Sequence, residues 1–361
     1  MTDRKISLGQ WMTVLFLTLF PLGTEGLPDR LWEVGAAAWV CPLLAGAVAV
    51  GAAAILTRRP VRGPGALAGG LLRRWGGKVG RSLTALFFLW GLVLTTAHAA
   101  RIGGRLSDSL RASPVLITAV VLLLAGWLAA GGVPAFARTC EIFALAVGFG
   151  FLLIFLFGVF RLDWENVLLW DWGELAQVPQ GTLSAGGVLA VGAYALFLLG
   201  DVRAETASRR WALTRLGSIF LLLAAAMVLV LGRLGAALAA QIDRPFFQMV
   251  SGLGFEGAFQ RLEELVSALW VLGDLALLGV LLLSLRRLLA VTVQRQESRA
   301  LGWIVPAVAF LGSIHVSLWN RVLAGPLLPA GSLAALVLLL CCLAGVKKGH
   351  AKKSEKIEKR D

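Results

Sequence analysis

Ionisable side chains inside apolar segments are the first candidates for chemistry in this sequence. Glu25, His98 and Asp274 each lie in or beside a segment that is apolar enough to enter a membrane. Charged groups are costly there, so such residues are candidates for a ligand or ion site. Glu25 suits a ligand ammonium, with a structural role at a cavity mouth as an equal alternative. Asp274 has no basic residue three or four positions away, so its partner is another helix, water or a ligand, or its carboxyl is protonated.

Two hydroxyl groups come just before His98 in the same apolar segment, on Thr95 and Thr96. All three side chains are candidates for polar contacts with a ligand in a pocket. The commoner alternative for a threonine in a membrane helix is a hydroxyl that bonds back to a carbonyl of its own helix. The sequence leaves both interpretations open.

The stretch 17–32 should position Glu25, because its helix-breaking residues interrupt an apolar segment. The breakers fall within eight residues and are Pro21, Gly23, Gly26 and Pro28. Unpaired backbone groups are costly in lipid, so a broken helix is tolerated only inside protein or beside a cavity. We predict free N–H groups from Gly23 to Gly26, including that of Thr24, facing an anionic ligand group. The alternative is a helix that ends near Phe20, followed by an exit loop.

The composition is that of a polytopic membrane protein. Of the 361 residues, 58% are hydrophobic and 15% are charged, and the mean hydropathy is +0.80. We predict an all-α fold in which residues 1–346 form one bundle, followed by a basic tail at 347–361. The ten predicted spans are 8–32 (broken), 35–57, 82–104, 114–132, 139–160, 184–202, 212–234, 262–290, 300–320 and 327–346.

The basic residues favour a cytoplasmic location for both termini. With the N-terminus inside, 25 of the 34 Lys and Arg residues fall on the cytoplasmic side, and nine, including Arg101 and Arg105, fall on the other. The loop 58–81 and the tail should lie against anionic lipid headgroups. Because topology explains the net charge of +13, we expect no nucleic-acid partner.

A second weak point is predicted in the sixth span, which a five-plus-five inverted repeat would pair with the first. This span contains several glycines, among them Gly192, and Tyr194 is the single tyrosine of the chain. The connection 235–262 predicts one or two short interfacial helices, serving as a lid or as a partner surface. No nucleophile elbow, phosphate loop or zinc motif appears, so we expect no enzyme activity, no metal and no cofactor.

The sequence resembles the B subunits of bacterial spore germinant receptors, in the amino acid–polyamine–organocation transporter superfamily. The similar segments are KISLGQ at 5–10, the Gly23-Thr24 break followed by Pro28, AWV at 38–40, FQRLE at 259–263, LWV at 269–271 and the basic tail. Two features depart from the family pattern. The glutamate that often follows a glycine in the sixth span is missing after Gly192, and Asp274 is not expected.

The resemblance implies a leucine-transporter-like fold and a germinant sensor that works with A and C subunits in the spore inner membrane. A small nutrient, such as an amino acid, would bind near the membrane midplane, with its carboxylate on the N–H groups near Gly23 and its ammonium on Glu25 or helix carbonyls. The ligand-binding candidates are Gly23, Thr24, Glu25, Gly26, Thr95, Thr96, His98, Gly192, Tyr194 and Asp274. The alternatives are a proton- or sodium-coupled permease, with Asp274 or Glu25 as proton site, and a ligand-free structural or channel-forming subunit.

Overall fold

The structure is a computed structural model in which the protein is built from helices. It describes residues 5–25, 29–56, 66–160, 162–168, 171–203, 209–253, 262–294, 299–315, 318–319, 322 and 325–344. Over these ranges no β-strand forms, and the only strand-like pairing is a single parallel bridge between Ile6 and Val202. The predicted all-α polytopic membrane fold is confirmed.

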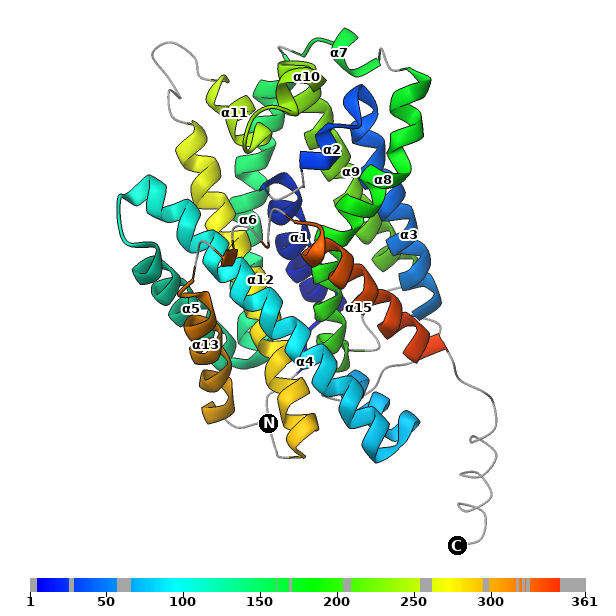
Figure 1. The fold of residues 1–361 in the computed structure, drawn as a ribbon, viewed down its shortest axis with the longest axis vertical. Helices are drawn as coiled ribbons and strands as arrows, with labels where there is room; N and C mark the ends of the chain where they lie inside the picture. The colour runs from blue at the N-terminus through cyan, green and yellow to red at the C-terminus, as the bar shows by residue number, and fades with distance from the viewer. Residues whose placement is uncertain are drawn as a thin grey trace, which may run out of the picture.

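Figure 1 shows the arrangement of the described helices. In chain order they are α1 (Leu8–Glu25), α2 (Asp29–Trp32), the 3-10 helix η1 (Gly35–Trp39), α3 (Val40–Leu56), α4 (Ala66–Leu110), α5 (Pro114–Ala130), α6 (Gly132–Val159), α7 (Glu165–Leu168), α8 (Trp172–Leu189), the 3-10 helix η2 (Ala190–Asp201), α9 (Arg209–Leu234), α10 (Ala236–Ala239), α11 (Pro245–Ser251), α12 (Leu262–Val293), α13 (Arg299–Ser313) and α15 (Leu327–Ala344).

Each predicted span overlaps one of these helical segments. Among the described residues, six segments are long and apolar enough to cross a membrane, and α5, α13 and α15 hold shorter apolar stretches. The outer face of α6 carries a stripe of exposed apolar side chains at helical spacing, which suits contact with acyl chains. Its members are Ile142, Leu145, Phe149, Leu152 and Leu156. The ten-span topology of a single bundle and the inverted repeat remain predictions.

Helix α1 is the central element of the bundle. It packs against α6, α9 and α12, and Figure 1 shows it (dark blue) enclosed among them. Pro21 lies inside α1, and its ring faces Gly273 of α12 so closely that a Cβ on Gly273 would overlap it. The glycine therefore allows α1 and α12 to approach at the level where the proline removes a backbone donor from α1.

In the stretch 17–32 the first helix does not end near Phe20, as the alternative expected, and residues 26–28 lie outside the described residues. Helix α1 runs through Pro21 to Glu25, and the short α2 starts at Asp29. Gly26 lies outside the described residues. Because α1 begins at Leu8, Gly23 and Glu25 stand at the C-terminal end of a helix, where free carbonyl groups, rather than free N–H groups, are presented.

The predicted weak point in the sixth span takes the form of a change in winding rather than a gap. Helix α8 continues directly into η2, a 3-10 helix of 12 residues, which is long for this geometry. Side chains of α1 and α12 hydrogen-bond to its carbonyl groups: Trp11 Nε1 donates to Ala195, and Ser284 Oγ donates to Tyr194 at 2.8 Å. These donors help to stabilise the tighter winding, because backbone bonds in 3-10 geometry are weaker.

Two predicted connections differ in their outcome. The loop predicted at 58–81 is wrong from Ala66 onward, because α4 begins there. Within α4 two helical segments meet at Gly76, whose non-helical φ of 77° favours glycine. The connection 235–262 does contain two short helices, α10 and α11. Helix α11 buries Phe246, Met249 and Val250 against the bundle. The tail 347–361 lies outside the described residues.

Candidate functional site: a buried charged cluster

Glu25 ends α1 and meets two arginines of α4. Arg105 Nη1 forms an ion pair with Glu25 Oε2, and Arg101 Nη2 lies 3.7 Å from the same oxygen. The Glu25 and Arg105 side chains are 4% and 3% exposed, and that of Arg101 is 18% exposed. The C-terminal end of a helix carries partial negative charge, so a carboxylate there needs positive partners. The two arginines supply them.

Asp274 of α12 is bound by the same guanidinium. Arg105 Nη2 donates to Asp274 Oδ2, so one arginine of α4 joins acids from α1 and α12. Of the partners that the sequence left open for Asp274, the structure therefore supplies one from another helix. The predicted span 82–104 ended too early, because α4 continues to Leu110 and carries the half-buried Arg101 and the buried Arg105.

Trp270 connects this group to α1 and to the helix above it. Its Nε1 donates to Thr24 Oγ1 at 3.0 Å, and the Arg105 guanidinium carbon lies 5.6 Å from the centre of its ring. The ring of Phe246 in α11 packs against the Trp270 ring, with 6.4 Å between the two ring centres. Helix α11 thus covers the group from the end of the bundle where α10 and α11 gather in Figure 1.

His98 completes what we call the charged cluster, defined as Glu25, His98, Arg101, Arg105 and Asp274. The imidazole is buried and lies within electrostatic reach of Arg101 and Glu25. Within the described residues, its Nδ1 has no hydrogen-bond partner, and neither do Nε and Nη2 of Arg101. Glu25 and Asp274 equal Arg101 and Arg105 in number of formal charges. Buried polar atoms normally have partners, so these open positions suit a polar ligand.

The remaining candidates do not join the charged cluster. The hydroxyls of Thr95 and Thr96 donate to carbonyls of their own helix, Gly91 and Leu92, both at 2.8 Å. This is the commoner of the two alternatives given for these threonines. Gly23 is a packing position, because a Cβ there would overlap the Leu223 side chain of α9. The predicted use of N–H groups from Gly23 to Glu25 is therefore wrong, since these groups belong to the last turn of α1.

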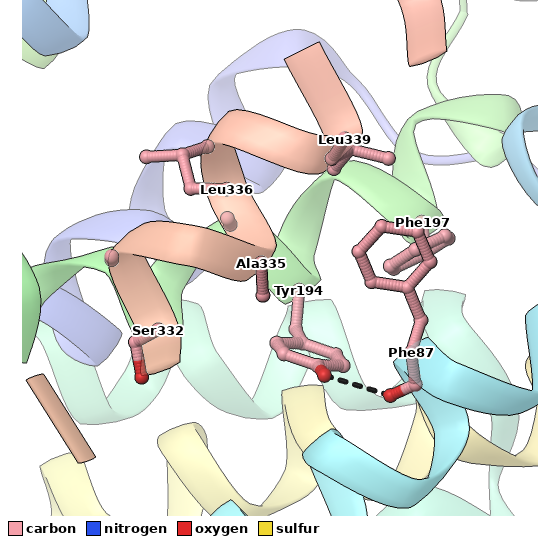
Figure 2. Close-up of a pocket in the computed structure, with 9 residues that line it drawn as sticks. Phe87, Tyr194, Phe197, Ser332, Ala335, Leu336 and Leu339 are labelled. Atoms are coloured by element: carbon pink, nitrogen blue, oxygen red, sulfur yellow. Dashed lines mark hydrogen bonds between the residues drawn. The ribbon is translucent and has the colours of Figure 1, made fainter. Parts of the chain in front are cut away.

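Gly192 and Tyr194 lie on η2, away from the charged cluster. Gly192 packs against Leu19 of α1, and the Tyr194 hydroxyl donates to the carbonyl of Phe87 at 2.8 Å. Figure 2 shows the Tyr194 ring in a mainly apolar pocket with residues of α15, including Ser332. The pocket volume of about 10 Å³ is at the lower limit for one water. It is too small for an amino acid.

The sequence held a signal for the two arginines that was missed. His98, Arg101 and Arg105 are spaced i, i+3 and i+7, which places them on one face of a helix. Two acids in other apolar segments, Glu25 and Asp274, lacked local partners. Charges inside a membrane protein pair with one another, so the sequence predicts that this basic helix face contacts the two acids.

Comparison with models of protein families gives a match over most of the chain. A sequence model described as "Spore germination protein" matches residues 5–318. This chain belongs to the spore germination protein family. The match agrees with the predicted resemblance to germinant receptor B subunits, and it includes every member of the charged cluster. The family consists of germination-related membrane proteins and is not a known class of enzyme. The curated proteins contain no match to this chain.

Proposed function

We propose that this spore germination protein is the nutrient-sensing subunit of a germinant receptor and binds a small zwitterion, such as an amino acid, at the charged cluster. The observation that carries the proposal is the unused hydrogen-bonding capacity of Arg101 and His98 inside a buried, charge-balanced site. The sensor would act with A and C subunits in the spore inner membrane, with both termini cytoplasmic.

The cluster offers complementary groups for both ends of a zwitterion. The ligand carboxylate would bind Arg101, because a guanidinium forms strong, paired hydrogen bonds with a carboxylate. The ligand ammonium would bind Glu25 and the free carbonyl groups at the end of α1. Arg101 Nη2 and Glu25 Oε2 are 3.7 Å apart, so a ligand would displace only a weak contact between these side chains. Arg105 would stay shared between Glu25 and Asp274.

Signalling would follow from the helices that the cluster joins. Arg101 and Arg105 belong to α4, Glu25 to α1 and Asp274 to α12, and α11 covers them. The pockets at Tyr194 and near Lys5 do not include residues of the cluster, and Phe246 of α11 packs against Trp270 beside it. In this proposal α11 moves away to admit the ligand. A ligand that binds the closed bundle more tightly than the open one shifts this equilibrium, and partner subunits would detect the shift.

A coupled amino-acid permease is the second candidate, and the position of Arg105 favours it. Because this arginine contacts both Glu25 and Asp274, a proton on one acid leaves Arg105 paired with the other. Such an arrangement allows proton exchange without leaving a lone buried charge. The two candidates differ in whether the ligand accumulates across a membrane.

Replacing Arg101 tests the site itself. In Arg101→Gln we expect the dissociation constant of the responding amino acid to rise by about tenfold or more, because a charge-assisted hydrogen bond to the ligand is lost. The measurement is equilibrium binding of a radiolabelled amino-acid panel to the purified protein. Arg111→Gln, at an exposed turn just beyond α4, is the matched control and should bind like the wild type. Equal binding by Arg101→Gln and the wild type would locate the ligand elsewhere.

A further inference from the structure

A polar pocket lies at the opposite end of α1 from the charged cluster. It has a volume of about 260 Å³ and lies beside the N-terminal ends of α1 and α6. Its lining residues are Lys5, Ser7, Gln10, Pro134, Arg138 and Arg203. The length of α1 separates this pocket from Glu25 by about 25 Å. It is therefore independent of the site discussed above.

The pocket brings together three cations from different segments. Lys5 precedes α1, Arg138 is on α6, and Arg203 follows η2. None of the described lining residues is acidic, and among the described acids nearby Asp201 pairs with Arg287. Glu141 accepts from the neutral Gln10 Nε2 at 3.1 Å and keeps one negative charge against the three cations. The local charge is therefore positive. Three basic side chains around one cavity are the arrangement that binds a compact, multiply charged anion.

The start of α1 adds to the positive potential. Ser7 Oγ accepts from Gln10 N at 3.1 Å, while Gln10 Oε1 accepts from Ser7 N at 3.0 Å. This reciprocal capping box fixes the first turn of α1 and directs the positive end of the helix at the pocket. Pro134 lies in the first turn of α6, which brings a second helix N-terminus to the same cavity. Helix N-termini favour phosphate and related anions.

We infer that this pocket binds a phosphate group, supplied either by an anionic lipid or by a free phosphate. Such an anion would connect three segments that meet here. Ile6 N donates to the carbonyl of Asp201 at 2.8 Å, and Arg203 N donates to the carbonyl of Ile6 at 2.9 Å, so the segment before α1 is already paired with the end of η2. An anion held by Lys5, Arg138 and Arg203 fastens both to α6 and stabilises this end of the bundle.

The test uses the full-length protein in phosphatidylcholine nanodiscs. The thermal unfolding midpoint is followed as inorganic phosphate is added, with chloride at equal ionic strength as the reference, and again in discs that contain phosphatidylglycerol. We expect a rise in the midpoint with phosphate, with phosphatidylglycerol, or with both. A rise with phosphatidylglycerol alone identifies a lipid phosphate as the ligand, whereas a rise with inorganic phosphate alone identifies the free anion.

In the double variant Lys5→Gln/Arg138→Gln, the anion concentration that gives half of the rise in the unfolding midpoint should increase by about tenfold or more. The reason is the loss of charge-assisted contacts with the anion. Arg111→Gln is the matched control, because Arg111 is exposed just beyond α4 and does not line the pocket. A midpoint that responds to neither anion would overturn the inference. So would a double variant that responds as the wild type and Arg111→Gln do.

Discussion

Replacing Arg105 with Gln should destabilise the protein by about 3–5 kcal/mol, because breaking a buried ion pair leaves uncompensated charge. Arg105 is the counter-ion of both Glu25 and Asp274, and all three side chains are at most 4% exposed. The change also removes the cation above the Trp270 ring. The effect should be measured as the loss of unfolding free energy or of thermal midpoint in detergent.

Companion variants separate the charge effect from simple loss of packing. The double variant Arg105→Gln/Asp274→Asn leaves Glu25 paired with Arg101, so the remaining charges balance and most of the lost stability should return. Arg111→Gln controls for the loss of an exposed arginine and should change stability by at most about 0.5 kcal/mol. An Arg105→Gln protein as stable as the wild type would show that this arginine does not hold α1, α4 and α12 together.

Replacing Arg287 with Gln should have an effect of similar size at the other buried ion pair. Arg287 Nη2 pairs with Asp201, and its Nη1 donates to the carbonyl of Phe197 at 3.0 Å. The variant leaves the Asp201 carboxylate buried and removes one donor to η2. We expect a loss of about 3–5 kcal/mol in unfolding stability. Amide exchange in 190–201 should also accelerate, since η2 loses side-chain support.

The neighbouring arginine provides a matched control. Arg286 is half-buried, whereas Arg287 and its partner Asp201 are buried, so Arg286→Gln should cost much less than Arg287→Gln. Asp201→Asn/Arg287→Gln should regain part of the lost stability, because no lone charge remains. If Arg286→Gln and Arg287→Gln were equally destabilised, the pair with Asp201 would not explain the effect.

The fold class was predictable because it follows from composition and apolar run lengths. Every predicted span overlaps a helical segment, and 235–262 contains α10 and α11 as expected. The start of α4 at Ala66 was not predictable from the Gly- and Pro-rich loop pattern. Packing in the bundle and a kink at Gly76 allow a helix where local propensity is weak. The winding of η2 also depends on donors from α1 and α12, which local sequence does not reveal.

The candidate site was predictable only in its acids. Glu25 and Asp274 were chosen because charge is costly in apolar segments, and the structure brings them together through Arg105. The arginines were overlooked because basic residues were counted only by membrane side and not considered as partners for the acids. The glycines near the end of α1 were misjudged because close packing against Leu223 requires glycine as much as a ligand would.

The most direct test of the account compares ligand binding with ligand uptake by the purified protein in proteoliposomes. A radiolabelled amino-acid panel is offered with and without proton and sodium gradients, and bound and accumulated label are measured separately. The account predicts saturable binding of at least one amino acid, with no accumulation under any gradient. Gradient-driven accumulation would contradict the receptor proposal and favour the permease, with Glu25 and Asp274 as its proton sites. Absence of binding across the panel would contradict both.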